Sequence, residues 1–133
     1  MTNSKAARRP PVHMIDSEAD ALTDLALGVE ERLPQVSEML LKEIARAHIH
    51  SAKTIPADVV TMQSTVEFTD GATGARRVVQ LVYPKDADIA DGRISILTPV
   101  GAGLIGLREG QAILWPDRGG KERVLTIDKV RRD

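Results

Sequence analysis

Two amphipathic stretches occupy the N-terminal third of the chain. Apolar residues recur at helical spacing over residues 17–33 and again over residues 34–47, while charged residues fill the positions between them. Pro34 separates the two stretches, because proline begins a helix more readily than it continues one. The pattern therefore predicts two helices that form an antiparallel hairpin, a short coiled coil, over residues 15–50.

Beyond residue 58 the hydrophobic period changes from helical to alternating. Alternation predicts strands over residues 60–68, 75–83, 92–97, 112–115 and 123–130. Turn residues such as Gly, Asp and Pro separate these strands, so a mostly antiparallel sheet of about five strands is expected over residues 58–133. Residues 51–57 are the expected linker. Residues 1–14, which are polar and basic, are expected to be a poorly ordered tail.

A short segment between the third and fourth strands reads T-P-V-G-A-G-L-I-G over residues 98–106. Thr98 can cap a helix, Pro99 suits the first helical position, and Gly106 can end the helix in a left-handed conformation. A helix this short depends on tertiary packing. Its glycines match the spacing G-x-G-x-x-G, but no βαβ unit surrounds them, so we interpret them as allowing close packing rather than phosphate binding.

The composition narrows the classes of function. The chain has 18 basic and 19 acidic residues, so it lacks the basic excess typical of nucleic-acid binding, and any contact with DNA or RNA is expected to be indirect. The absence of cysteine excludes disulfides and thiolate metal sites. No apolar run is long enough to span a membrane and no signal peptide is recognisable, which favours a cytoplasmic protein without membrane contact. We expect a monomer.

Three patterns invite comparison with metal sites. His48 and His50 are two residues apart near the end of a predicted helix, where such a pair points in different directions. The acidic loop 86–92 lacks the spacing of a calcium loop. Glu30 and Glu31 lie at the predicted hairpin tip, where carboxylates can hold Mg²⁺, although a charged helix end is the simpler interpretation. We therefore expect no metal, no cofactor and no catalytic residue.

Several sequence blocks resemble a known family. The block P-V-G-A-G-L-I-G-L-R-E-G-Q-A-I-L-W at residues 99–115 resembles the C-terminal domain of bacterial Gre transcript-cleavage factors. The blocks P-A-D-V-V-T-M-Q-S-T-V-E-F at 56–68, L-V-Y-P at 81–84 and S-I-L-T-P-V-G-A-G-L-I-G-L at 95–107 resemble the Rnk branch (regulator of nucleoside diphosphate kinase) of that superfamily. The combination is specific, although each block alone would be weak.

The resemblance implies an α+β fold in which the helical hairpin precedes an FKBP-like β domain with one short helix. In Gre factors this β domain docks on the rim helices of RNA polymerase at the mouth of the secondary channel, and acids at the coiled-coil tip help to hold a catalytic Mg²⁺. Carried over by motif, the polymerase-binding residues are Leu97, Thr98, Pro99 and Val100. Leu97 replaces an acidic residue of the Gre motif, so its contact would be apolar.

The resemblance also shapes the functional hypotheses. The hairpin is shorter than in Gre factors and only Glu30 and Glu31 stand at its tip, so we predict docking without RNA cleavage. The leading hypothesis is a non-enzymatic binder of RNA polymerase that modulates elongation or competes with Gre factors. The alternatives are a weak transcript-cleavage cofactor that uses both glutamates, and an FKBP-like prolyl isomerase. Regulation of nucleoside diphosphate kinase, implied only by the branch name, is left open, including an indirect route through transcription.

Overall fold

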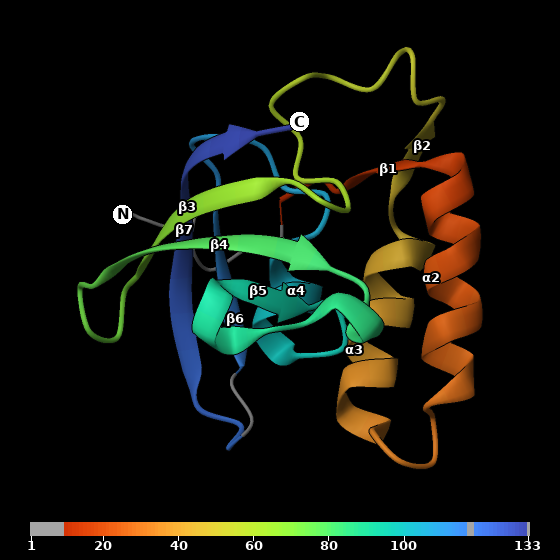
Figure 1. Ribbon diagram of the computed structural model, residues 1–133, viewed down its shortest axis with the longest axis horizontal. Helices are drawn as coiled ribbons and strands as arrows, with labels where there is room; N and C mark the ends of the chain where they lie inside the picture. Colours follow the sequence, from red (N-terminus) through yellow and green to blue (C-terminus); the bar gives the residue numbers. More distant parts are fainter. Residues whose placement is uncertain (1–9, 117–118, 133) are drawn as a thin grey trace.

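The computed structural model describes residues 10–116 and 119–132, in which a five-stranded sheet lies beside a pair of helices (Figure 1). No helix in these residues is both long and apolar enough to cross a membrane. The elements are β1 (His13–Ile15), α2 (Asp16–Gly28), α3 (Pro34–Ala45), β2 (His48–His50), β3 (Thr65–Asp70), β4 (Arg76–Val82), the short 3₁₀ turns η1 (Pro84–Asp86) and η2 (Ile89–Asp91), β5 (Arg93–Ser95), α4 (Pro99–Leu104), β6 (Ala112–Pro116) and β7 (Glu122–Arg131).

The large sheet has the strand order β5-β4-β3-β7-β6 and curls around α4 (Figure 1). Neighbouring strands are antiparallel except for β5, which pairs with β4 in parallel because the segment with η1 and η2 carries the chain back across the sheet edge. Buried and part-buried residues alternate along β3, as its sequence predicts. The expected mixture of helices and strands is confirmed, whereas the FKBP-like description stays a prediction.

The first strand of the sheet begins later than its hydrophobic pattern predicts. Residues 61–64 form a turn, in which the Thr61 N–H donates to Ser64 Oγ at 2.9 Å and Gln63 adopts a φ of 73°. Val60 and Met62 are nevertheless buried. Burial of apolar side chains in a turn therefore imitates the alternation of a strand.

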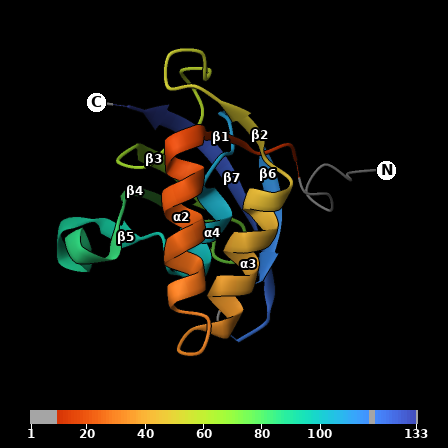
Figure 2. The same ribbon diagram turned by 90° about the vertical axis from the view of Figure 1, so that its right-hand side faces the viewer.

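Helices α2 and α3 lie side by side and run in opposite directions (Figure 2). They contain 13 and 12 residues, and the turn at residues 29–33 joins them. Leu22 and Leu40 are fully buried in the same hydrophobic cluster as Leu104 of α4 and Trp115 of β6. The helical region and the sheet region therefore share one core, and the helices lie along the sheet region rather than projecting from it.

Two sequence expectations need correction at the junction of the helices with the sheet region. Val12 and Met14 are buried, so the segment expected as a poorly ordered tail enters the core at its last residues; residues 1–9 lie outside the described residues. Helix α3 ends at Ala45, and His48 and His50 belong to β2, which pairs in parallel with β1. Backbone pairing with β1 therefore replaces the helix end expected there.

The start of α2 also lies slightly earlier than the apolar pattern, which covers residues 17–33. The helix begins at Asp16, one residue before Ser17, and no side chain caps it. Glu18 instead crosses to the sheet region, where its Oε1 accepts a hydrogen bond from the Met62 N–H at 3.1 Å. This contact fixes the first turn of α2 on the segment that leads into β3.

Candidate functional site

The N-terminus of α4 is built by a local hydrogen-bond pattern. Thr98 Oγ1 accepts a hydrogen bond from the Gly101 N–H at 3.0 Å, as expected of an N-cap residue. The same hydroxyl donates to the Ser95 carbonyl at 2.8 Å, which ties the helix start to the end of β5. Pro99 occupies the first helical turn, where it gives up no intrahelical hydrogen bond. The segment 98–100 is therefore held in one place.

Close packing fixes the rest of α4 against the sheet region. A Cβ at Gly101 would collide with the Ser95 carbonyl oxygen, and a Cβ at Gly103 would come within 3.0 Å of the Trp115 indole ring. Only glycine allows these approaches. The Trp115 indole N–H donates to the Pro99 carbonyl at 2.6 Å. The glycines of this block therefore serve packing, as the sequence indicates.

An apolar groove of about 360 Å³ opens beside the N-terminus of α4. Its lining comes from β3, β4, the η2 segment, β5, α4 and β7, which together bring residues far apart in the sequence to one surface. The lining residues are Phe68, Arg77, Val79, Ala87, Ile89, Ile94, Ser95, Thr98, Pro99, Val100 and Arg123. Apolar side chains dominate this set, so the groove suits an apolar side chain of a binding partner.

The groove has an exposed apolar edge and two guanidinium groups. Ile89 is 85% exposed, so an apolar side chain at the edge of the groove faces solvent. The Arg77 guanidinium lies 5.9 Å from the centroid of the Phe68 ring, and Arg123 pairs with the buried Asp70 carboxylate. The lining residues include no carboxylate, histidine or cysteine. This arrangement favours binding of an apolar and acidic surface over catalysis.

The structure brings together three of the four residues that the motif assigned to docking. Thr98, Pro99 and Val100 line the groove. Leu97 does not: it is 8% exposed and belongs to the hydrophobic core, so its side chain cannot form an apolar tip on the surface. Sequence reasoning missed Ile89, whose only signal is an isoleucine in the otherwise polar loop 84–92.

Glu30 and Glu31 lie in the turn between α2 and α3, at the end of the helical pair opposite β1 and β2 (Figure 1). Both side chains are exposed. Among the described residues, no group of three or more histidine, aspartate or glutamate side chains is arranged to hold a metal ion. The two glutamates therefore stand apart from the groove and supply at most two neighbouring carboxylates.

Comparisons with known proteins agree with this fold. The family model "Transcription elongation factor, GreA/GreB, C-term" matches residues 55–132. The Escherichia coli K12 protein described as "Regulator of nucleoside diphosphate kinase" is 36% identical over 119 residues, which cover 90% of this chain and 88% of that protein. Transcription elongation factor GreA of Azorhizobium caulinodans is 34% identical over 113 residues, which cover 79% of this chain and 72% of that protein.

A solved structure gives the same result. The structure titled "Prokaryotic transcription elongation factor GreA/GreB from Nitrosomonas europaea" superimposes with a TM-score of 0.70 and 37% sequence identity. The match covers 92% of this chain and 99% of the other, so it includes the helical pair as well as the sheet. The chain therefore belongs to the GreA/GreB C-terminal family of transcription elongation factors.

Proposed function

We propose that this chain binds bacterial RNA polymerase through the groove beside α4 and regulates elongation without cleaving RNA. In this proposal Thr98, Pro99 and Val100 contact the rim helices at the mouth of the secondary channel. Leu97 supports them from the core. Binding at this place would exclude a Gre factor from the same site, so the chain would compete with Gre factors.

The groove is the observation that carries this proposal. It lies at the segment to which the family resemblance assigns docking, and the exposed Ile89 extends its apolar surface. Arg77 adds positive charge to the lining, whereas the Arg123 guanidinium is paired with the Asp70 carboxylate. A partner segment with an apolar side chain next to a carboxylate would therefore complement the groove at Arg77. Exposed apolar patches rimmed by polar groups are typical of protein interaction sites.

The proposed absence of cleavage rests on the helical pair. Helices of 13 and 12 residues extend only about 20 Å at 1.5 Å per residue, and both pack along the sheet region. A carboxylate contributes to catalysis only when it is held within about 0.5 Å of its productive position. In this proposal Glu30 and Glu31, in an exposed turn at the end of this short pair, are not held in that way.

Prolyl isomerisation has less support than polymerase binding. Phe68 is the single aromatic residue among those that line the groove, and Trp115 is buried beneath α4 with 1% of its surface exposed. A proline ring would therefore meet mostly aliphatic walls and two guanidinium groups. The expected similarity to FKBP concerns only the fold, and a fold does not by itself confer prolyl isomerase activity.

Direct binding to core RNA polymerase tests the proposal. The double variant Ile89→Ser/Val100→Ser removes apolar surface from the groove, and Leu27→Ser/Ile49→Ser removes two other exposed apolar side chains, which are 51% and 52% exposed. We expect the groove variant to bind at least about tenfold more weakly, or about 1.4 kcal/mol. The control variant should bind like the wild-type chain. An equal loss of affinity for core RNA polymerase in both variants, or no binding by the wild-type chain, would contradict the proposal.

A further inference from the structure

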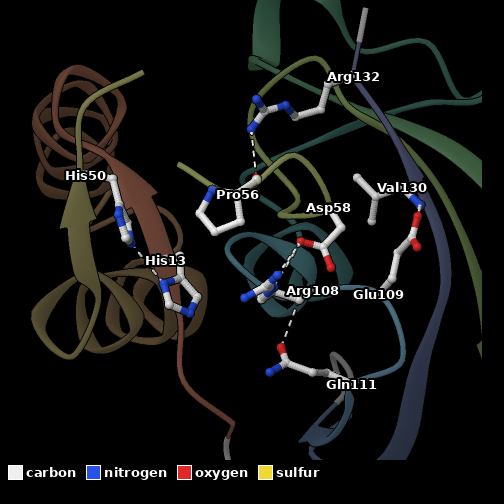
Figure 3. A network of polar contacts seen from close by, with 9 residues as sticks. All are labelled: His13, His50, Pro56, Asp58, Arg108, Glu109, Gln111, Val130 and Arg132. Atoms are coloured by element: carbon white, nitrogen blue, oxygen red, sulfur yellow. Dashed lines mark hydrogen bonds and ion pairs between the residues drawn. The ribbon is translucent and has the colours of Figure 1, made fainter. Parts of the chain in front are cut away.

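Three histidines meet on one face of the two-stranded sheet formed by β1 and β2. His13 lies opposite His48 in the parallel register, and His50 is two residues further along the same strand. Alternate residues of a strand share a face, so all three rings lie on the same side. His13 Nδ1 lies 3.0 Å from His50 Nε2 (Figure 3), and the rings of His13 and His48 stack with their centroids 5.4 Å apart.

The contact between His13 and His50 limits how many protons these two rings can carry. A hydrogen bond between two imidazole nitrogens needs one N–H donor and one free lone pair. The first proton added to the pair can sit on an outer nitrogen and leave this bond in place. A second proton on the same pair must occupy the accepting nitrogen, which removes the acceptor and places two positive charges at hydrogen-bond distance.

The charged surroundings of His13 add to this effect. It faces His48 and His50 from β2, Arg108 from the segment after α4, and Asp58 from the segment before β3. Burial, the two histidines and Arg108 lower the pKa of His13, and Asp58 opposes them. Asp58 is already engaged by Arg108, whose Nε and Nη2 both lie 2.9 Å from Asp58 Oδ1 (Figure 3). Its carboxylate is therefore largely compensated.

Strands β1 and β2 form the joint between the helical pair and the sheet region. Helix α2 begins directly after β1, and α3 ends shortly before β2. The His48 N–H donates to the Val12 carbonyl at 2.7 Å, and the His13 N–H donates to the Gly106 carbonyl at 3.0 Å. These two bonds connect β2 to β1 and β1 to the end of the α4 segment.

We propose that the joint of β1 and β2 is proton-sensitive: uptake of a second proton by the pair His13 and His50, next to His48, loosens the helical pair from the sheet region. None of the residues that line the groove beside α4 belongs to β1, β2 or the helical pair, so we expect the groove to keep its shape. Acidification therefore changes how the helices are held without removing the proposed docking surface. The inference stands on the geometry of the histidines and does not depend on polymerase binding.

Histidine titration by NMR tests the first part of this proposal. These three residues are the only histidines of the chain, so three ring C–H signals report on the whole cluster. We expect the His13 signal to titrate at lower pH than in an unfolded reference peptide. A His13 curve at the ordinary histidine pKa would overturn the proposal.

Amide hydrogen exchange tests the loosening itself. The amides of His13 and His48 should lose protection between about pH 7.5 and about pH 5, after correction for the intrinsic exchange rate. The Ile127 amide, which donates to the Gln111 carbonyl at 2.9 Å in the large sheet, should keep its protection. Unchanged protection at His13 and His48 would contradict the proposed joint.

The variant His50→Gln separates protonation from simple loss of the contact. The glutamine amide can still hydrogen-bond to His13 but does not titrate, so the pair can no longer take up two protons and the pH dependence of protection at β1 and β2 should be much reduced. His13→Gln provides the reciprocal variant and should behave in the same way. Persistence of the wild-type pH dependence in both variants would assign it to groups outside the cluster and overturn the inference.

Discussion

Trp115 donates its indole N–H to the carbonyl oxygen of Pro99 at 2.6 Å, and this buried bond joins strand β6 to the first residue of α4. Trp115→Phe leaves the carbonyl without this donor and also removes the part of the indole ring that lies against Gly103. We expect a loss of about 1–3 kcal/mol in the free energy of unfolding, measured by chemical denaturation followed by circular dichroism. Tyr83→Phe, a change at a part-buried ring, should alter stability by less than about 0.5 kcal/mol. If Trp115→Phe were as stable as the wild-type chain, the hydrogen bond from Trp115 to Pro99 would not be needed for stability.

Gly101→Ala should destabilise the chain even though alanine favours helices by up to about 1 kcal/mol over glycine. The added Cβ would meet the Ser95 carbonyl, which is backbone and cannot turn aside. Gly28, the last residue of α2, is the matched control because a Cβ there meets nothing within 4 Å. Gly28→Ala should therefore stabilise by about 0.5–1 kcal/mol. If both substitutions changed the free energy of unfolding in the same direction, the close approach of α4 and β5 would be refuted.

Glu18 should make stability depend on pH in an unusual direction for a carboxylate. Burial raises its pKa, although the hydrogen bond from Met62 and the charge of Arg132 oppose the shift. The folded state therefore holds the Glu18 carboxyl proton more tightly than the unfolded state. The stability that this protonated carboxyl contributes is present below the pKa of Glu18 in the unfolded state and is lost as the pH rises through its pKa in the folded state. Glu18→Gln keeps an acceptor for Met62 without the charge.

We accordingly expect Glu18→Gln to gain stability relative to the wild-type chain as the pH rises from about 4 to about 7. Denaturation at a series of pH values measures this difference. Glu30→Gln, at an exposed position of the helical turn, should show no such trend. If the wild-type chain instead became more stable relative to Glu18→Gln as the pH rose, burial would not raise the pKa of Glu18.

The parts of the fold that the sequence predicts well are those with long, regular patterns. Strand β3 alternates buried and part-buried residues over its full length, and each helix repeats its apolar positions over three turns. The three-residue strands β1 and β2 carry too little pattern to be recognised. The contact of His13 with His50 spans 37 residues and depends on that unrecognised pairing.

The candidate site shows the same limit. Thr98 and Pro99 predict the start of a helix from the sequence, and the family motif assigns docking to the same segment. Whether Leu97 faces outward depends on how Ser95 and Thr98 tie that start to β5, which no local pattern contains. Ile89 enters the groove wall because β5 runs parallel to β4 and the intervening loop returns over the sheet edge. Non-local topology therefore decides the composition of the groove.

Displacement of a labelled Gre factor from core RNA polymerase measures whether this chain occupies the Gre docking site. We predict that the unlabelled chain displaces the Gre factor completely and suppresses cleavage of a backtracked transcript without cleaving it alone. The Ile89→Ser/Val100→Ser variant should need at least about tenfold higher concentration, and Leu27→Ser/Ile49→Ser should match the wild-type chain. Simultaneous binding of both proteins, with cleavage unaffected at saturating concentrations of this chain, would show that the chain does not occupy that site.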